Sequence, residues 1–198
     1  MTIFYKKLEF RDVEQITAEL LSIAREFNPE QFVSKKFDTQ LLEQRVPSLT
    51  KQFKELGIEI DVFREFVSQP FRGLGIHQDG AVGYPKKYAI NWPIENCKGA
   101  YMCWWNFNGD PEVSIASTDP TANQPSIFYS AHNASKVEQV ELVTPTLVNI
   151  ENFHSVENNI NSVRRMISFR FVTEPEHLIK VFAPMVELVD TLVLEASA

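Results

Sequence analysis

The feature that most constrains the fold is a series of short segments, from residue 58 onward, in which apolar and polar residues alternate. At the start of this series Ile58, Ile60 and Val62 alternate with Glu59 and Asp61, as in a β-strand with one buried face. Similar strand-like segments follow at residues 88–94, 100–107, 126–130, 137–143, 146–150 and 164–172. Gly, Pro and Asn, which are typical turn residues, separate them. The pattern predicts an antiparallel β-sandwich or jelly roll.

The region before residue 58 has a helical periodicity instead. After a short strand-like start, Asp12 is expected to be the N-cap of an amphipathic helix whose apolar residues recur every three or four positions. In a second helical stretch, Pro47 either breaks the helix or begins a new turn, and Gly57 ends it.

The fold class is therefore predicted to be mainly β with flanking α-helices. We expect a single domain over residues 1–198, with N-terminal helices packed on one sheet. Its expected parts are a helical support at 1–57, a jelly-roll core at 58–173 and a helical tail at 174–198.

Composition and charge argue against several classes of partner. The net charge is −7 and no face rich in Lys and Arg is evident, so a nucleic-acid partner is not expected. The first residues carry charges throughout, unlike a signal peptide, and no apolar run is long enough to span a membrane. Cys97 and Cys103 match neither a zinc pair nor a disulfide scaffold. We expect two reduced thiols and a cytoplasmic location; no pattern predicts an oligomeric state.

Three residues have the composition of a metal site. His77 and Asp79 are two positions apart, so on an extended segment both side chains point to the same side. His154 would have to join them from another strand. Two imidazoles and one carboxylate are the ligand set that holds Fe(II) and leaves coordination positions open, although Mn, Co, Ni and Zn accept the same atoms. The other histidines, His132 and His177, lie in polar segments and are expected to be exposed.

A His-x-Asp pair alone is more often a hydrogen-bonded surface pair, but here a wider pattern surrounds it. In this pattern the chain resembles the Fe(II)/2-oxoglutarate-dependent dioxygenases. The resemblance rests on H-x-D at 77–79, on P-x-L-x-N…H-S-V-x-N between Pro145 and Asn158, and on R-x-x-x-S-x-R-F at 164–171. The segment YAINWPIENC, at 88–97, is also similar to the strand that follows H-x-D in several branches of this superfamily.

The resemblance implies a double-stranded β-helix with Fe(II) at its mouth, held by His77, Asp79 and His154. It also implies 2-oxoglutarate as co-substrate and O2 as oxidant. In this superfamily a basic residue on the strand after the distal histidine binds the far carboxylate of 2-oxoglutarate. Position favours Arg164 for this role, and the adjacent Arg165 is the alternative.

Alternation along residues 164–171 divides this strand into two faces. Arg164 shares a face with Met166, Ser168 and Arg170, so Ser168 and Arg170 are candidates to line the co-substrate pocket. The opposite face is apolar except for Arg165, which we expect at the exposed start of the strand.

Two more predictions concern the neighbouring strands. Asn91 is a candidate donor to the co-substrate carboxylate, and otherwise a satisfied core amide. Alternation allows only one of Trp104 and Trp105 to point inward. The segments 80–87, with Lys86 and Lys87, and 108–125 are expected to be loops that shape the entrance.

The function expected from this resemblance is hydroxylation of an unactivated C–H bond, with conversion of 2-oxoglutarate to succinate and CO2. The substrate would be a small molecule or a peptide side chain. Two alternatives remain at this point: a cupin-like metal-binding jelly roll with other chemistry, and a non-catalytic binding module. The cupin-like alternative leaves Arg164 and Ser168 without a purpose, and the binding module predicts affinity for metal or ligand without release of succinate.

Overall fold

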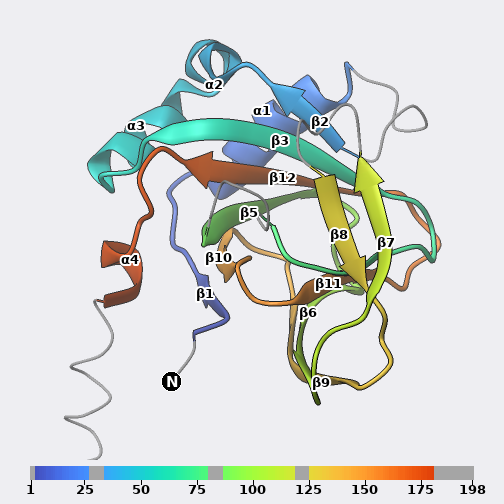
Figure 1. The fold of residues 1–198 in the computed structure, drawn as a ribbon. Helices are drawn as coiled ribbons and strands as arrows, with labels where there is room; N and C mark the ends of the chain where they lie inside the picture. Colours follow the sequence, from blue (N-terminus) through green and yellow to red (C-terminus); the bar gives the residue numbers. More distant parts are fainter. Residues whose placement is uncertain (1–2, 27–33, 80–86, 119–124, 181–198) are drawn as a thin grey trace, which may run out of the picture.

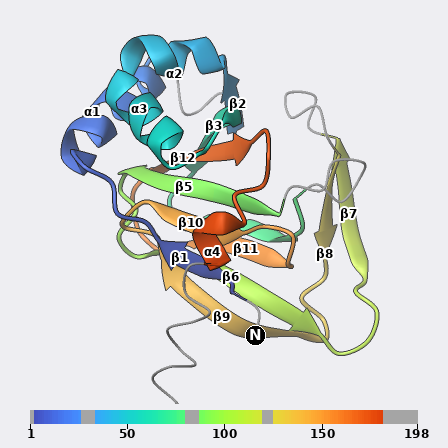
Figure 2. The ribbon, with the colours of Figure 1, turned by 90° about the vertical axis from the view of Figure 1, so that its left-hand side faces the viewer.

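Two six-stranded antiparallel β-sheets form the body of the protein, and three helices lie over one of them (Figures 1 and 2). The computed structural model describes residues 3–26, 34–79, 87–118 and 125–180. Strand order is β1-β10-β5-β12-β3-β2 in the first sheet and β7-β8-β4-β11-β6-β9 in the second. The prediction of a mainly β protein with antiparallel sheets is confirmed.

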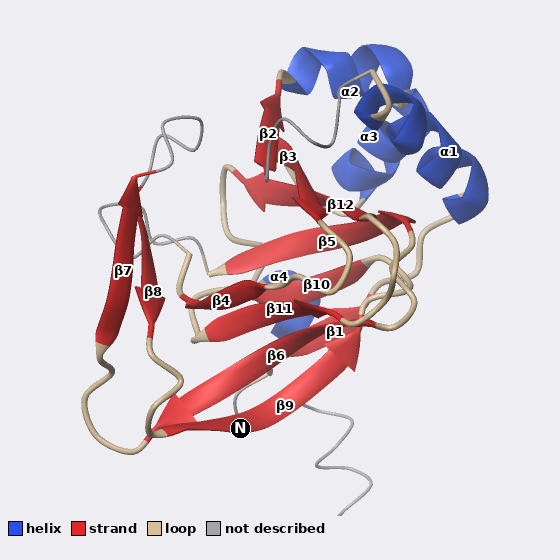
Figure 3. Ribbon diagram, turned by 90° about the vertical axis from the view of Figure 1, so that its right-hand side faces the viewer, coloured by secondary structure: helices blue, strands red, loops and turns tan. Residues whose placement is uncertain are grey.

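The first sheet has strands from both ends of the chain. Its members are β1 (Tyr5–Lys7), β2 (Ser34–Phe37), β3 (Ile60–Ser68), β5 (Tyr88–Glu95), β10 (Thr146–Asn149) and β12 (Arg164–Phe171). The second sheet comprises β4 (Leu74–His77), β6 (Ala100–Phe107), β7 (Val113–Thr118), β8 (Pro125–Tyr129), β9 (Ala134–Glu141) and β11 (His154–Asn158). Figure 3 shows β7 and β8 standing apart from the other strands of this sheet as a two-stranded arm.

The described helices differ in their N-caps, and the predicted N-cap Asp12 precedes the first of them without a side-chain cap hydrogen bond. They are α1 (Val13–Ala24), α2 (Thr39–Arg45), α3 (Pro47–Glu55) and α4 (His177–Lys180). The Asp38 carboxylate accepts the Gln40 backbone N–H at 2.9 Å and caps α2. Pro47 begins α3 rather than ending α2, and Gly57 follows α3 with φ of 67°. No helix within the described ranges is both long and apolar enough to cross a membrane.

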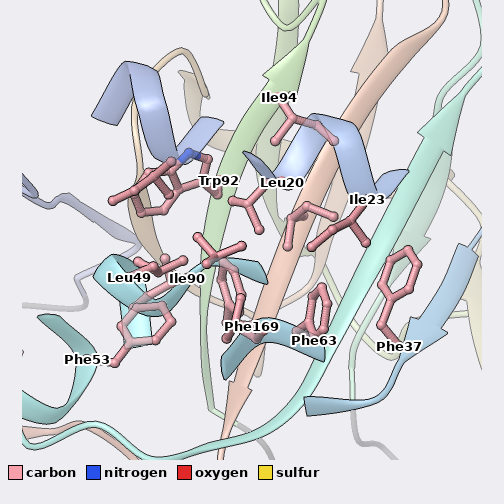
Figure 4. Packing of buried hydrophobic residues seen from close by; sticks show 14 of the residues in the cluster. Leu20, Ile23, Phe37, Leu49, Phe53, Phe63, Ile90, Trp92, Ile94 and Phe169 are labelled. Carbon is pink, nitrogen blue, oxygen red and sulfur yellow. The ribbon is translucent and has the colours of Figure 1, made fainter. Parts of the chain in front are cut away.

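The larger hydrophobic core lies between these helices and the outer face of the first sheet (Figure 4). Every second residue of β5 and β12 belongs to it, including Trp92 and Phe169, because side chains alternate along a strand. Phe53 of α3 meets Phe169 edge-on at 5.1 Å, and the Trp92 indole donates to Thr17 of α1 at 2.9 Å. These contacts fix the first sheet from outside.

The intervening residues of the same strands face the second sheet. Ala89, Val148 and Met166 of the first sheet pack with Met102 and Trp104 of the second. The first sheet is therefore covered on both faces, and only its inner face can line a cavity between the sheets.

One prediction about the strand 164–171 is wrong. Arg165 is 5% exposed and lies under α1, where its Nη1 donates to Glu65 at 3.1 Å and to the Ala24 carbonyl at 3.0 Å. Glu95 approaches its Nε at 3.3 Å. The buried Glu65 and the partly exposed Glu95 lie beside the arginine charge, which explains why Arg165 lies among apolar residues rather than at an exposed edge.

Other differences concern short segments. Strand β1 confirms the predicted strand-like start, whereas β2 lies within the region predicted to be helical and β7 lies within the predicted loop 108–125. Cys97 and Cys103 are free and buried, but Cys97 lies in the turn after β5 rather than on the strand with Cys103. Of the predicted helical tail, the structure describes α4, and residues 181–198 lie outside the described residues. Residues 80–86 of the predicted entrance loop 80–87 also lie outside them.

Glu65 should make the stability of the protein depend on pH. Burial raises its pKa to about 7, against the opposing charge of Arg165. The folded protein therefore holds this proton up to a higher pH than the unfolded chain does, and the free energy of unfolding should fall as pH rises from about 4.5 to about 7. Urea denaturation should show that the free energy of unfolding falls less between pH 5 and pH 8 for Glu65→Gln than for wild type. Glu59→Gln, at an exposed position, is the control, and equal falls in wild type and Glu65→Gln would contradict the assignment.

Candidate metal centre

Pairing between β4 and β11 places two histidines side by side. His154, the first residue of β11, is the register partner of His77, the last residue of β4, and their ring centroids are 4.3 Å apart. Asp79 follows β4 and is held close by its backbone N–H, which donates to the Ile150 carbonyl at 3.1 Å. One potential ligand atom from each of His77, Asp79 and His154 lies within 4.8 Å of the others. The three side chains could therefore hold one metal ion.

Backbone carbonyls orient both imidazoles. Nδ1 of His77 is 2.8 Å from the Gly75 carbonyl, and Nδ1 of His154 is 2.8 Å from the Asn152 carbonyl. A carbonyl only accepts, so each Nδ1 carries the proton and each Nε2 keeps a lone pair. Nε2 of His77 lies 3.5 Å from Oδ1 of Asp79. Both Nε2 atoms are thus the available metal donors.

The electrostatic environment keeps this group in its ligand form. Burial, together with the neighbouring His77, lowers the pKa of His154 to about 3, so its imidazole is neutral at pH 7. Burial alone would raise the pKa of Asp79, but the neighbouring His77 and the charge of Arg170 hold it well below its usual range. A neutral imidazole and an ionised carboxylate are the forms that bind a divalent cation.

Asn149 shapes the turn that leads into His154. Its side-chain oxygen accepts the backbone N–H groups of Glu151 at 3.1 Å and Asn152 at 3.2 Å. Its backbone carbonyl accepts the Trp104 indole N–H at 2.8 Å. The turn presents the Asn152 carbonyl to His154, so Asn149 positions this imidazole indirectly. The sequence analysis included Asn149 only as one letter of a motif.

A cavity between the two sheets adjoins the three side chains. Its volume is about 550 Å³ including its open mouth, and most of its wall is apolar. It is lined by His77, Asp79 and His154, by the predicted residues Asn91, Arg164, Ser168 and Arg170, and by Phe66, Val67, Ser68, Leu74, Met102, Ile150, Val156 and Met166. The candidate site residues from the sequence are thus brought together around one space.

The two arginines of β12 that face this cavity lie in different surroundings. Nη2 of Arg170 donates to Oδ2 of Asp79 at 2.6 Å, next to the histidines. Arg164 comes six residues earlier (170 − 164), which is about 20 Å along an extended strand. It pairs in register with Ser68. The cavity therefore has one arginine beside the candidate metal ligands and another farther along the strand.

Arg164 is a buried cation without an acidic partner among the described residues. It is 3% exposed, and its Nε has no hydrogen-bond partner. Burial lowers the pKa of its guanidinium, and the Cys97 thiol beside it opposes this shift. Buried charges in proteins are normally paired. A buried guanidinium that lines a cavity and has an unsatisfied Nε has the chemistry of an anion-binding group.

Asn91 and Ser168 form the polar part of the wall between these ends. The Ser168 hydroxyl donates to the Asn91 side-chain oxygen at 2.6 Å, and Nη1 of Arg170 donates to the same hydroxyl. Arg165, the alternative to Arg164, lies on the opposite face of the sheet from the cavity.

The remaining residues singled out from the sequence lie elsewhere. His132 and His177 are exposed and do not belong to the metal-ligand group. Trp104 is buried between the sheets, whereas the indole of Trp105 donates to Ser155 at 2.9 Å. Phe128 of β8 places its ring 5.6 Å from that of His77 and forms one side of the metal centre. Periodicity alone had not singled out Phe128.

Comparisons with known proteins support the same fold. No family model matches the chain, and neither does any curated protein. The solved structure of the viral collagen prolyl hydroxylase vCPH from Paramecium Bursaria Chlorella virus-1, a complex with 2OG, matches with a TM-score of 0.52 and 10% identity over 85% of this chain and 95% of that chain. At this identity the likeness shows the fold alone.

Two further structures show weaker similarity. A Pseudomonas putida prolyl-4-hydroxylase has a TM-score of 0.48 and 12% identity, over 86% of this chain and 92% of that one. HygX from Streptomyces hygroscopicus, with nickel and 2-oxoglutarate bound, has a TM-score of 0.47 and 12% identity over 84% and 81%. The vCPH match therefore supports the predicted fold, and the two weaker matches add no further argument.

Removing the Asn149 side chain should destabilise the protein and disturb the metal centre. Asn149→Ala leaves two backbone N–H groups without their acceptor, and we expect a loss of about 1–3 kcal/mol in the free energy of unfolding. Urea denaturation measures this loss. Asn152→Ala is the matched control, since Asn152 acts through its backbone. Equal stabilities of the two variants would contradict the role given to Asn149.

Proposed function

We propose that the protein is an Fe(II)- and 2-oxoglutarate-dependent oxygenase that hydroxylates an unactivated C–H bond. The observation that carries this proposal is the pairing, in one cavity, of a His-Asp-His group with a buried arginine to which the described residues offer no acidic partner. The first is suited to a divalent metal and the second to a carboxylate. A cupin-like metal protein would need only the first.

The residues present fit the implied metal. The donors that would hold Fe(II) are Nε2 of His77, Nε2 of His154 and one oxygen of Asp79. This ligand set leaves other coordination positions of Fe(II) free. When bound, Fe(II) with 2-oxoglutarate and O2 would supply the oxidising chemistry, with release of succinate and CO2. The protein supplies positioning and a mostly apolar wall that limits water.

Arg164 is the residue that we assign to the far carboxylate of 2-oxoglutarate. Its planar guanidinium can form two parallel hydrogen bonds with a carboxylate, and its burial strengthens such a contact. Ser168 and Asn91 would contribute further polar contacts along the wall. The position of Arg165 on the helix-covered face supports the choice of Arg164 over Arg165.

We further propose a single oxygenase domain, in which the N-terminal helices support the first sheet and the β-sheets carry the site. The substrate would be a small molecule or a peptide side chain that reaches the metal centre beside Phe128. The buried free thiols of the protein fit the cytoplasmic location expected from the sequence.

Binding of metal and co-substrate should be visible directly. Anaerobic addition of Fe(II) and 2-oxoglutarate to the wild-type protein should produce a charge-transfer band in the visible spectrum. His77→Ala should abolish it, because one of the three ligands is lost. His132→Ala, which removes an exposed histidine, is the control and should retain the band. A well-folded wild-type protein without the band would contradict the proposed function.

Arg164 should control affinity for 2-oxoglutarate and leave metal binding intact. Arg164→Gln should raise the 2-oxoglutarate concentration needed for half-maximal band formation by about tenfold or more, since a hydrogen bond to a charged group contributes about 1.5–3 kcal/mol. Arg164→Lys keeps the charge without the planar fork and should be intermediate. Unchanged 2-oxoglutarate affinity in Arg164→Gln would remove Arg164 from this role.

A further inference from the structure

Arg170 differs from Arg164 in that its guanidinium is already engaged. Nη2 donates to Oδ2 of Asp79 at 2.6 Å, and Nη1 donates to the Ser168 hydroxyl. Its side chain is 16% exposed, so little solvent screens the contact with Asp79. The two terminal nitrogens of this arginine thus have defined protein partners within the cavity.

The hydrogen bonds continue beyond Ser168 and fix the direction of the guanidinium. The Ser168 hydroxyl donates to the side-chain oxygen of Asn91 at 2.6 Å, so its own oxygen is left to accept from Arg170. Asn91 and Ser168 are register partners on β5 and β12. A connected series Asn91–Ser168–Arg170–Asp79 therefore links the rigid first sheet to the residue that follows β4 of the second sheet.

This series divides the two oxygens of Asp79 between different tasks. Oδ2 accepts from Arg170, whereas Oδ1 faces His77 and lies 3.5 Å from its Nε2. Oδ1 points toward the other candidate metal ligands, and Arg170 contacts Oδ2 instead. A carboxylate held in this way offers one oxygen to a metal rather than two.

We propose that Arg170 is a positioning residue, which restricts Asp79 to a single metal-ligand oxygen and offsets the negative charge that Asp79 brings to the metal. This inference rests on the proposed function and deepens it. It separates the two arginines of β12: Arg164 binds the co-substrate, and Arg170 acts through Asp79. With one oxygen of Asp79 held by Arg170, Asp79 would offer a bound metal a single ligand atom.

The charge of Arg170 has a second consequence that can be measured on the metal alone. A fixed positive charge near the metal stabilises Fe(II) relative to Fe(III), because the more highly charged ion is repelled more strongly. In air without 2-oxoglutarate, each Fe(II) loses one electron to O2, which is reduced to superoxide. Removal of the Arg170 charge should make this oxidation faster.

The experiment compares Arg170→Gln and Arg170→Lys with wild type, with Arg72→Gln as an exposed-arginine control. Each protein is loaded with Fe(II) anaerobically and exposed to air without 2-oxoglutarate, and Fe(III) is followed by electron paramagnetic resonance. Arg170→Gln should oxidise about threefold faster or more, whereas Arg170→Lys, which keeps the charge, should stay near the wild-type rate. Arg72→Gln should match wild type.

The coordination of Asp79 is tested in the same variants with Co(II) alone, whose visible absorption reports ligand number. Both Arg170→Gln and Arg170→Lys should change this spectrum, because neither side chain reproduces the two-point contact with Asp79 and Ser168. If Arg170→Gln fails to fold, Ser168→Ala serves instead, since loss of the Ser168 hydroxyl loosens Arg170. It should change the Co(II) spectrum in the same direction.

Three outcomes separate this inference from the function on which it rests. Wild-type protein that binds neither Fe(II) nor Co(II) would overturn both. Wild-type protein that binds metal, with an unchanged Co(II) spectrum and oxidation rate in Arg170→Gln, would overturn only the role of Arg170. Loss of 2-oxoglutarate binding in Arg170→Gln with unchanged metal-only spectra would make Arg170 a co-substrate clamp and also overturn the positioning role.

Discussion

The antiparallel register between β4 and β11 is the constraint on which the candidate site depends. It makes His77 and His154 direct partners, so that both imidazoles leave the sheet on the same face. A slip of one residue would turn one of them to the opposite face, because side chains alternate with a period of two. The Ile150 carbonyl, which accepts the Asp79 backbone N–H, then places the carboxylate beside the pair. The metal centre is thus a product of strand pairing rather than of any local motif.

Rigidity of the first sheet supports this arrangement from the other side of the cavity. Its outer face is packed against helices through large aromatic residues such as Trp92 and Phe169, and its inner face bears Asn91, Ser168 and the two arginines. The buried Arg165, Glu65 and Glu95 group attaches β12 to the end of α1. Side chains on β12 therefore project into the cavity from a strand that is held on both faces. A site built on such a strand keeps its geometry better than one built on loops.

Much of this organisation follows from periodicity, and the exceptions have physical causes. Alternation correctly separated the two faces of β12 and identified β5, β6 and β10, because each has one face in a core. Strand β2 was missed since its four residues include two lysines, and β7 was missed because its Ser and Thr residues precede the sequence Asp-Pro, which is typical of turns. The prediction that Arg165 is exposed was wrong because its partner Glu65 is 100 residues away, and no local pattern reveals such a pair. For the same reason, nothing in the sequence indicated that Arg170 would contact Asp79 rather than only line a pocket.

The central claim is that three side chains distant in sequence hold one divalent metal, with a dicarboxylate bound between it and Arg164. A crystal structure of the protein with Mn(II) and 2-oxoglutarate, recorded with anomalous scattering, tests this claim most directly. The account predicts a single anomalous peak bounded by Nε2 of His77, Nε2 of His154 and one oxygen of Asp79, and a carboxylate of 2-oxoglutarate at the Arg164 guanidinium. A peak elsewhere in the molecule, or a metal at this position with Arg164 free of the ligand, would contradict it.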